Sequence, residues 1–203
     1  MEATGSRRPL RSRNSQWAKR LARLLLRTRI TPNAVSVSGI AFAAAGAACF
    51  ALAPENRWLW LAGALFVQLR LLANLMDGLL AVEGGRSSPT GALYNEFPDR
   101  IEDALLLVAA GYGAGWPVLG WCAALLAMGT AYVRALGGAI GLPQDFCGPM
   151  AKQHRMALLT VGAAISLFVA AMPAVLATIA AGSAATAARR LHRQAAALRD
   201  AGR

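Results

Sequence analysis

Six of the ten acidic residues of this chain lie between positions 74 and 103, within a sequence that is otherwise strongly apolar. They are Asp77, Glu83, Glu96, Asp99, Glu102 and Asp103. A charged side chain at the centre of a bilayer costs about 2.5 to 3.5 kcal/mol, so carboxylates at that depth need cations or water beside them. Hard divalent cations such as Mg²⁺ and Mn²⁺ prefer oxygen ligands and bridge them to phosphate oxygens. The stretch is therefore a candidate site for metal-assisted phosphate chemistry.

The polar residues around this stretch follow helical spacing. One predicted helix carries a polar stripe at i, i+4, i+7 and i+11, formed by Arg70, Asn74, Asp77 and Ala81. The next carries a stripe at every fourth position, formed by Asn95, Asp99 and Asp103. Residues 84–90 between them have the composition of a loop that returns the chain to the same side, so the two stripes can face each other. The second of these helices begins near Gly91 or, alternatively, at Pro98.

This spacing resembles the CDP-alcohol phosphotransferase signature, which runs D-x-x-D-G-x-x-A-R, eight residues, and then G-x-x-x-D-x-x-x-D. Every gap of that signature is matched here. The residue types also match at five positions, which are Asp77, Gly78, Ala81, Gly91 and Asp99. Three positions differ, because Asn74 and Asn95 stand where the first and third aspartates are expected and Val82 replaces the arginine.

The resemblance implies a membrane enzyme that joins a CDP-linked group to an alcohol, with Mg²⁺ or Mn²⁺ as its cofactor. The metal-site positions implied by the signature are Asn74, Asp77, Asn95 and Asp99. The same signature makes Asp99 the catalytic base. It also implies substrate-binding positions at Gly78, Ala81 and Gly91.

The two asparagines bear directly on the metal site. An amide offers a carbonyl oxygen but no negative charge, so two fewer charges would hold the cations of a two-metal site. Asp103, Glu96 and Glu83 are candidates to compensate, and Asp103 lies on the same stripe as Asp99. We therefore add Asp103 to the expected metal ligands.

Basic residues outside the signature are candidates to bind substrate phosphate. Arg134 lies in a Y-x-R-A segment that resembles a segment of the family, and Lys152 and Arg155 lie where the family has a basic phosphate-binding segment, which they match loosely. Arg70 is placed to meet phosphate or to balance Asp77. Pairing of Arg70 with a carboxylate for packing alone is an equal alternative.

The composition describes an integral membrane domain. The chain has 203 residues, of which 56% are hydrophobic, so it is too apolar for an ordinary soluble domain and long enough for several spans. Its net charge is +11, and the basic residues fall in tails and in loops that border apolar segments. This placement favours anionic membrane lipid over nucleic acid as the partner. The three cysteines are widely spaced and indicate neither a disulfide framework nor a zinc site.

Apolar runs predict six transmembrane helices, at about residues 35–52, 58–82, 91–112, 117–138, 156–171 and 173–187. Before them, residues 16–27 place apolar and basic side chains on opposite sides, which predicts an amphipathic helix at the membrane interface. The expected organisation is an all-α polytopic membrane protein. A basic tail with the interfacial helix spans 1–29, a six-helix domain spans 30–188, and a basic tail, expected as a surface helix, spans 189–203.

The lysines and arginines predict the orientation of this domain. Nine lie in the N-terminal region through Arg29 and five lie in residues 189–203. Arg86, Lys152 and Arg155 lie in loops of the same side, whereas only Arg57 falls in an opposite loop. The positive-inside rule then places both termini and the active site at the cytoplasmic face of the plasma (inner) membrane.

The predicted function is transfer of a phosphatidyl group from CDP-diacylglycerol to a polar alcohol, with release of CMP, in phospholipid biosynthesis. The alternative is a non-catalytic membrane protein of the same fold that binds nucleotide-lipid or a partner, and the two asparagines are its best support. A transporter or channel is disfavoured because the polar residues concentrate at one end of the helices. Members of the family usually form homodimers, which the sequence neither supports nor excludes. The acceptor alcohol depends on the shape of a pocket.

Overall fold

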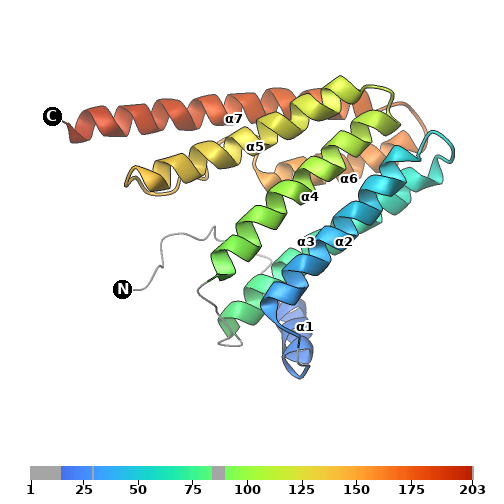
Figure 1. Ribbon diagram of the computed structural model, residues 1–203. Helices are drawn as coiled ribbons and strands as arrows, with labels where there is room; N and C mark the ends of the chain where they lie inside the picture. The colour runs from blue at the N-terminus through green and yellow to red at the C-terminus, as the bar shows by residue number, and fades with distance from the viewer. Residues whose placement is uncertain (1–14, 29, 84–89, 203) are drawn as a thin grey trace.

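The computed structural model describes residues 15–28, 30–83 and 90–202, and it is all-helical in these ranges, which confirms the predicted fold class (Figure 1). The seven helices of the described ranges are α1 (Gln16–Leu26), α2 (Pro32–Ala51), α3 (Trp58–Glu83), α4 (Gly91–Gly113), α5 (Pro117–Ala139), α6 (Lys152–Ser166) and α7 (Met172–Ala201).

The helices pack as one bundle around an apolar core. Helix α2 packs against α3 and α4, α5 packs against α4 and α7, and α6 lies against α3 and α7. Figure 1 shows α5 and α7 running side by side along one edge of the molecule. The core is tightly closed at the C-terminal end of α2, where the rings of Phe50 and Trp60 lie with their centroids 5.5 Å apart. Its most deeply buried large side chains include Leu106, Leu107, Met156, Leu159, Leu176 and Ile179.

Three helices of the described residues are long and apolar enough to cross a membrane, namely α2, α3 over Trp58–Ala81, and α5. Their outward faces carry large apolar side chains that the bundle leaves exposed, such as Val37, Leu65 and Leu125. Hydrocarbon accommodates such faces, so the chain is an integral membrane protein. Helix α6 has 15 residues and α4 carries several charges, so the count of six spans stays a prediction.

The starts of two helices agree with the sequence patterns. Thr31 caps α2, with its side chain accepting a hydrogen bond from the backbone N–H of Ala34 at 3.2 Å, and Pro32 occupies the first turn. Helix α4 begins at Gly91 and contains Pro98 within it, so the first of the two predicted starts is correct. The whole polar stripe of α4 therefore belongs to one helix.

The last two helices differ in extent from the predicted spans. Helix α6 begins at Lys152 and ends at Ser166, before the predicted end at 171. Pro173 lies in the first turn of α7 and has no N–H to continue a preceding helix, so the chain must break and restart before it. Helix α7 then runs through the predicted boundary at 189 as one helix. Its segment beyond 189 is part of the bundle, because Arg190 and Gln194 are buried.

Helix α1 lies against α3 through small residues. Ala18 and Ala22 are fully buried and pack on Met76 and Leu79 of α3. Trp17, expected on the apolar side, is 54% exposed. The bundle thus holds α1 through its alanines and leaves larger apolar side chains outside. The interfacial location of α1 stays a prediction.

Gly113 at the end of α4 lies directly against the backbone of α2, and a Cβ there would overlap the carbonyl oxygen of Phe50. Since a backbone atom within a helix cannot move aside, we expect Gly113→Ala to lower the free energy of unfolding by roughly 3 kcal/mol, at the upper end of overpacking effects. Thermal unfolding of the purified protein in detergent measures this change.

The matched control is Gly129→Ala in α5, where an added Cβ meets nothing within 4 Å. Alanine is favoured over glycine inside a helix by about 0.5–1 kcal/mol, so this variant should be at least as stable as the parent. Equal unfolding temperatures for the two variants would contradict the close packing of α2 and α4.

Candidate functional site

The polar stripes of α3 and α4 meet inside the bundle, as the spacing predicts. Asn74 of α3 donates from Nδ2 to Oδ1 of Asp99 at 2.5 Å and to Oε2 of Glu102 at 3.3 Å. Asp99, Glu102 and Asp103 are all buried, with at most 9% of each residue exposed. The two helices thus bring an amide and three carboxylates together, away from bulk water.

Arg70 joins the two helices at the centre of this cluster. The residue is fully buried, and its guanidinium forms an ion pair with Glu102 and donates to Asp103 Oδ1 at 2.8 Å. The same group donates to the backbone and side-chain oxygens of Asp99 at 3.2 and 3.3 Å. Of the roles considered for Arg70, pairing with carboxylates is the one observed, and its partners come from α4 rather than from Asp77.

Helix α6 adds two more cations. The Lys152 ammonium lies 2.5 Å from Asp99 Oδ1, and Arg155 donates to Asp103 Oδ2 at 2.9 Å. Arg155 also donates to the backbone oxygen of Met150 at 3.1 Å and to the Thr130 hydroxyl at 3.3 Å. Both oxygens of Asp103 therefore face arginines.

Asp77 lies apart from these ion pairs. Its Oδ2 accepts a hydrogen bond from the Ser36 hydroxyl of α2 at 2.6 Å. Its Oδ1 is buried and has no hydrogen-bond partner from another element among the described residues. Gly39, one turn along α2 from Ser36, lets the Glu102 carboxylate approach α2, because a Cβ there would lie 2.7 Å from Glu102 Oε1. Asp77 thus offers one buried carboxylate oxygen to a ligand.

The remaining predicted ligands differ in how far the structure describes them. Gly78 and Ala81 lie on α3, and Gly91 is the first residue of α4. The side chains of Asn95 and Glu83 lie outside the described residues. Glu96 is about half exposed and pairs with Arg134 and Arg100, so it does not join the buried carboxylates.

Arg134 lies at the edge of the cluster, near the loop between α5 and α6. It donates to Glu96 at 2.5 Å and to Gln144 at 3.2 Å, and its guanidinium lies over the ring of Phe146, 5.3 Å from the centroid. Arg193 of α7 pairs with Asp145 of the same loop at 2.9 Å. Two arginines from different helices therefore border this loop.

Asp145 organises the loop locally. Its carboxylate accepts hydrogen bonds from the backbone N–H and the thiol of Cys147, at 2.8 and 3.2 Å. Burial raises the pKa of Asp145, but these hydrogen bonds and the charges of Arg193 and Arg190 outweigh it, so its pKa lies below the usual value. The carboxylate therefore stays charged and keeps Arg193 in place.

Sequence reasoning missed three residues that shape the site. Ser36 supports Asp77, and Glu102 is the buried partner of Arg70. Arg190 donates to the backbone oxygens of Cys147 and Thr130, at 2.9 and 2.7 Å, and so ties the loop to α7. Glu102 carried a signal, since it lies one turn after Asp99 in an apolar helix. Ser36 and Arg190 had none, because their contacts depend on tertiary packing.

The described residues contain no group of three His, Cys, Asp or Glu side chains able to hold a metal ion together. Asp77 and Asp99 are the carboxylates at signature positions, and each has one oxygen that accepts no hydrogen bond from another element of the described residues, Oδ1 of Asp77 and Oδ2 of Asp99. Arg100 is the nearest cation to Asp99 Oδ2, at 3.5 Å. This donor set fits one divalent cation.

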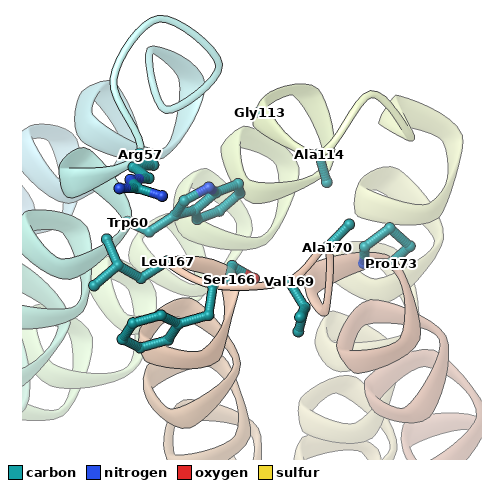
Figure 2. A pocket seen from close by; sticks show the side chains of 10 residues that line it. Arg57, Trp60, Gly113, Ala114, Ser166, Leu167, Val169, Ala170 and Pro173 are labelled. Atoms are coloured by element: carbon teal, nitrogen blue, oxygen red, sulfur yellow. The ribbon is translucent and has the colours of Figure 1, made fainter.

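A cavity of about 330 Å³ opens at the other end of the bundle (Figure 2). It lies between the start of α3, the end of α4 and the segment joining α6 to α7, and its lining includes Arg57, Trp60 and Ser166. Figure 2 shows no carboxylate among the labelled residues of that lining. The ionised cluster, rather than this cavity, is the candidate active site.

The fold and the site together define an integral membrane protein with a buried cluster of carboxylates and cations at one end of a helical bundle. No family model matches the chain. The phosphatidylinositol phosphate synthase of Mycolicibacterium smegmatis is 30% identical over 154 residues, which are 72% of this chain and 67% of that protein. The chain belongs to the CDP-alcohol phosphatidyltransferase family, as its signature implied.

Other relatives extend this comparison. The phosphatidylinositol phosphate synthase of Streptomyces avermitilis is 31% identical over 149 residues, 70% of this chain and 59% of that protein. The bifunctional IPC transferase and DIPP synthase of Rubrobacter xylanophilus is 37% identical over 166 residues, 79% of this chain. The chain spans 36% of the length of that protein.

Solved structures show the same fold. The phosphatidylinositol phosphate synthase of Mycobacterium tuberculosis with CDP-DAG bound superposes with a TM-score of 0.77 at 26% identity, over 89% of this chain and 94% of that one. The same protein in complex with manganese and citrate gives a TM-score of 0.76 over 87% of this chain and 88% of that one.

The buried cluster makes a prediction about stability. Removing one member of a buried ion-pair network leaves uncompensated charges and costs about 3–5 kcal/mol. We expect Arg70→Met to lower the unfolding temperature strongly, because three carboxylates of α4 lose their common partner. Arg193→Met is the control, since its exposed ion pair with Asp145 should contribute less than about 1 kcal/mol. Similar unfolding temperatures for both variants would refute a structural role for Arg70.

Proposed function

We propose that this chain transfers a phosphatidyl group from CDP-diacylglycerol to a polar alcohol and releases CMP. The observation that carries the proposal is the buried cluster in which Asp99, a carboxylate at a matching signature position, meets Asn74 and Lys152, while Asp77, the other such carboxylate, is buried one turn after Asn74 on α3. Family membership supports the reaction class. The relative with CDP-DAG bound in its structure supports the donor.

In the proposed reaction, the acceptor hydroxyl attacks the phosphorus of the phosphatidyl group, and the bond from that phosphorus to the bridging oxygen of the diphosphate breaks. CMP leaves with this oxygen. Asp99 accepts the proton of the hydroxyl through the lone pair of Oδ2 that the cation leaves free, while Arg70, Asn74 and Lys152 hold Oδ1 and fix the orientation of the carboxylate. Lys152 is also positioned to face the diphosphate.

Asp77 and Asp99 are the proposed ligands of a divalent cation, Mg²⁺ or Mn²⁺, and the neutral Asn74 and Asn95 occupy the other two signature positions. When bound, such a cation neutralises charge on the diphosphate and aligns it for displacement. The relative solved with manganese supports this assignment. Asp103 has a different part in the proposal, because both of its oxygens face arginines, and it serves to hold Arg70 and Arg155.

For the acceptor, we propose a phosphorylated alcohol of the inositol phosphate class. The relatives are phosphatidylinositol phosphate synthases, so the headgroup of their product carries a phosphate. Arg134 and Arg193 border the loop beside the cluster. Arg134 shares its partner Glu96 with Arg100, and the side chain of Arg193 is 57% exposed. Arginine recognises phosphate well because its planar fork can donate two parallel hydrogen bonds.

The proposed membrane arrangement has six spanning helices, α2 to α7, with α1 lying at the interface. The basic residues of α1, including Arg20, Arg23 and Arg27, would then face anionic lipid headgroups. Both termini and the active site lie at the cytoplasmic face in this arrangement, following the distribution of lysine and arginine.

CMP release by the purified protein tests the reaction. With CDP-diacylglycerol, Mn²⁺ and inositol phosphate, we expect release that Asp99→Asn reduces by about a thousandfold, at the strong end of general-base effects, because the amide cannot accept the proton. Because Asp99 pairs with Arg70 and Lys152 in the buried cluster, the variant should also unfold at a lower temperature, so release is measured well below that temperature on variant protein that still binds CDP-diacylglycerol. No release from the parent, together with retained binding of CDP-diacylglycerol, would favour the non-catalytic alternative.

The acceptor assignment has its own test. We expect Arg134→Gln to raise the KM for inositol phosphate about tenfold, since a charge-assisted hydrogen bond contributes about 1.5–3 kcal/mol. The KM for CDP-diacylglycerol should stay unchanged. Arg57→Gln, at the other end of the bundle, is the matched control and should change neither constant. A preference of the parent for unphosphorylated inositol would overturn the phosphate assignment.

A further inference from the structure

The charges in the cluster separate into two groups. Arg70 and Arg155 face Glu102 and Asp103, so two cations and two anions balance each other below the site. Asp77 and Asp99 remain. Lys152 of α6 pairs with Asp99 Oδ1, and Arg100, which also pairs with Glu96, lies 3.5 Å from Asp99 Oδ2. With the Lys152 charge counted, one divalent cation exceeds the two remaining carboxylates by one positive charge. A second would raise this excess to three, which is more than the two negative charges of a diphosphate offset, and a buried excess of charge is strongly unfavourable.

Asn74 also faces the cluster as a donor. Its amide nitrogen lies between Asp99 and Glu102, at 2.5 and 3.3 Å, and an amide oxygen in that position would meet two carboxylates. The neighbouring charges therefore fix the orientation of the amide. At the first signature position this chain thus places a hydrogen-bond donor against Asp99, where an aspartate would place a ligand.

Lys152 occupies the same oxygen of Asp99. Its ammonium lies 2.5 Å from Oδ1, and its side chain is 23% exposed. Arg70 also donates to this oxygen, at 3.3 Å. Three donors thus converge on Asp99 Oδ1, while Asp99 Oδ2 and the buried Asp77 Oδ1 accept no hydrogen bond from another element of the described chain. Asp99 Oδ1 is therefore held by donors from the protein, whereas Asp99 Oδ2 and Asp77 Oδ1 are available to a metal.

We propose that this site takes a single divalent cation, held by Asp77 and Asp99, and that the Lys152 ammonium supplies the positive charge that a second cation would bring. Asn74 and Asn95 lower the number of carboxylates at the signature positions. The positive charge of Lys152 is then sufficient in place of a second divalent cation. The inference rests on the proposed function, because that function is what calls for a divalent cation.

The number of bound ions tests this directly. Purified protein in mixed micelles with CDP-diacylglycerol is dialysed to equilibrium against Mn²⁺, and bound manganese per chain is measured after subtracting protein-free micelles of the same composition. We expect one ion for the parent. We also expect one for Asn74→Asp, because Lys152 still holds Asp99 Oδ1, and two for Asn74→Asp combined with Lys152→Met, which restores a carboxylate and removes the ammonium.

Two control variants accompany these. Asn74→Asp with Lys19→Met removes an exposed lysine of α1 and should bind one ion. Lys152→Arg keeps the charge and should also bind one. Unfolding temperatures within a few degrees of the parent establish that each variant is folded. Because the readout is bound manganese, it is independent of turnover, and a protein that binds one ion but releases no CMP would refute the proposed reaction alone.

Two ions bound to the parent would overturn the proposal, and so would none. One ion in both the parent and the combined Asn74→Asp, Lys152→Met variant would remove Lys152 from the role of the second cation. Two ions in the Asn74→Asp, Lys19→Met control would show that the carboxylate alone decides the number, which also refutes the role of Lys152.

Discussion

The buried pairing of Arg70 with the carboxylates of α4 is the interaction on which the rest of this structure depends. A lone guanidinium or carboxylate inside an apolar bundle is strongly unfavourable, and only close, well-directed partners offset that loss of hydration. Arg70 meets three carboxylates from one helix, and Arg155 of α6 meets the last of them. The register of α3, α4 and α6 is therefore fixed by charge as well as by shape, because sliding any of these helices by one turn would leave a buried charged side chain without its partner.

The fold and part of the site could be predicted from the sequence. The i, i+4, i+7 spacing placed Asn74 and Asp77 on one face, and the structure sets Asn74 against Asp99 as the two stripes require. What could not be predicted is which cation meets which anion. From the sequence, Arg70 could balance Asp77 on its own stripe or pair with a carboxylate of another helix. Nothing in the sequence indicated that Ser36 lies beside Asp77. These contacts depend on the rotation of whole helices about their axes, which local patterns do not determine.

Helix ends were harder to predict than helix faces. The break before Pro173 was predicted, because proline cannot continue a helix, but the apolar pattern runs past Ser166 without interruption and did not reveal that α6 ends there. The charged segment beyond residue 189 was expected at the surface because of its composition. Its helix nevertheless buries Arg190 and Gln194 by donating to backbone oxygens of α5 and the adjoining loop. Long polar side chains can enter a bundle when backbone oxygens there accept hydrogen bonds from them.

The loop that precedes Lys152 is held mainly by α7. Met150 donates its N–H to Thr186 at 2.9 Å, and Arg190 donates to the carbonyl oxygen of Cys147. Gly148 sits against the Thr186 side chain with a φ of 121°, a conformation that favours glycine. During synthesis α7 leaves the ribosome after this loop. The loop can therefore hold Lys152 against Asp99 only after Thr186 and Arg190 of α7 have been made and have packed against it. Helices α3 and α4 can pair earlier through Arg70, but one guanidinium offsets only part of the charge of their buried carboxylates until Lys152 and Arg155 of α6 join them.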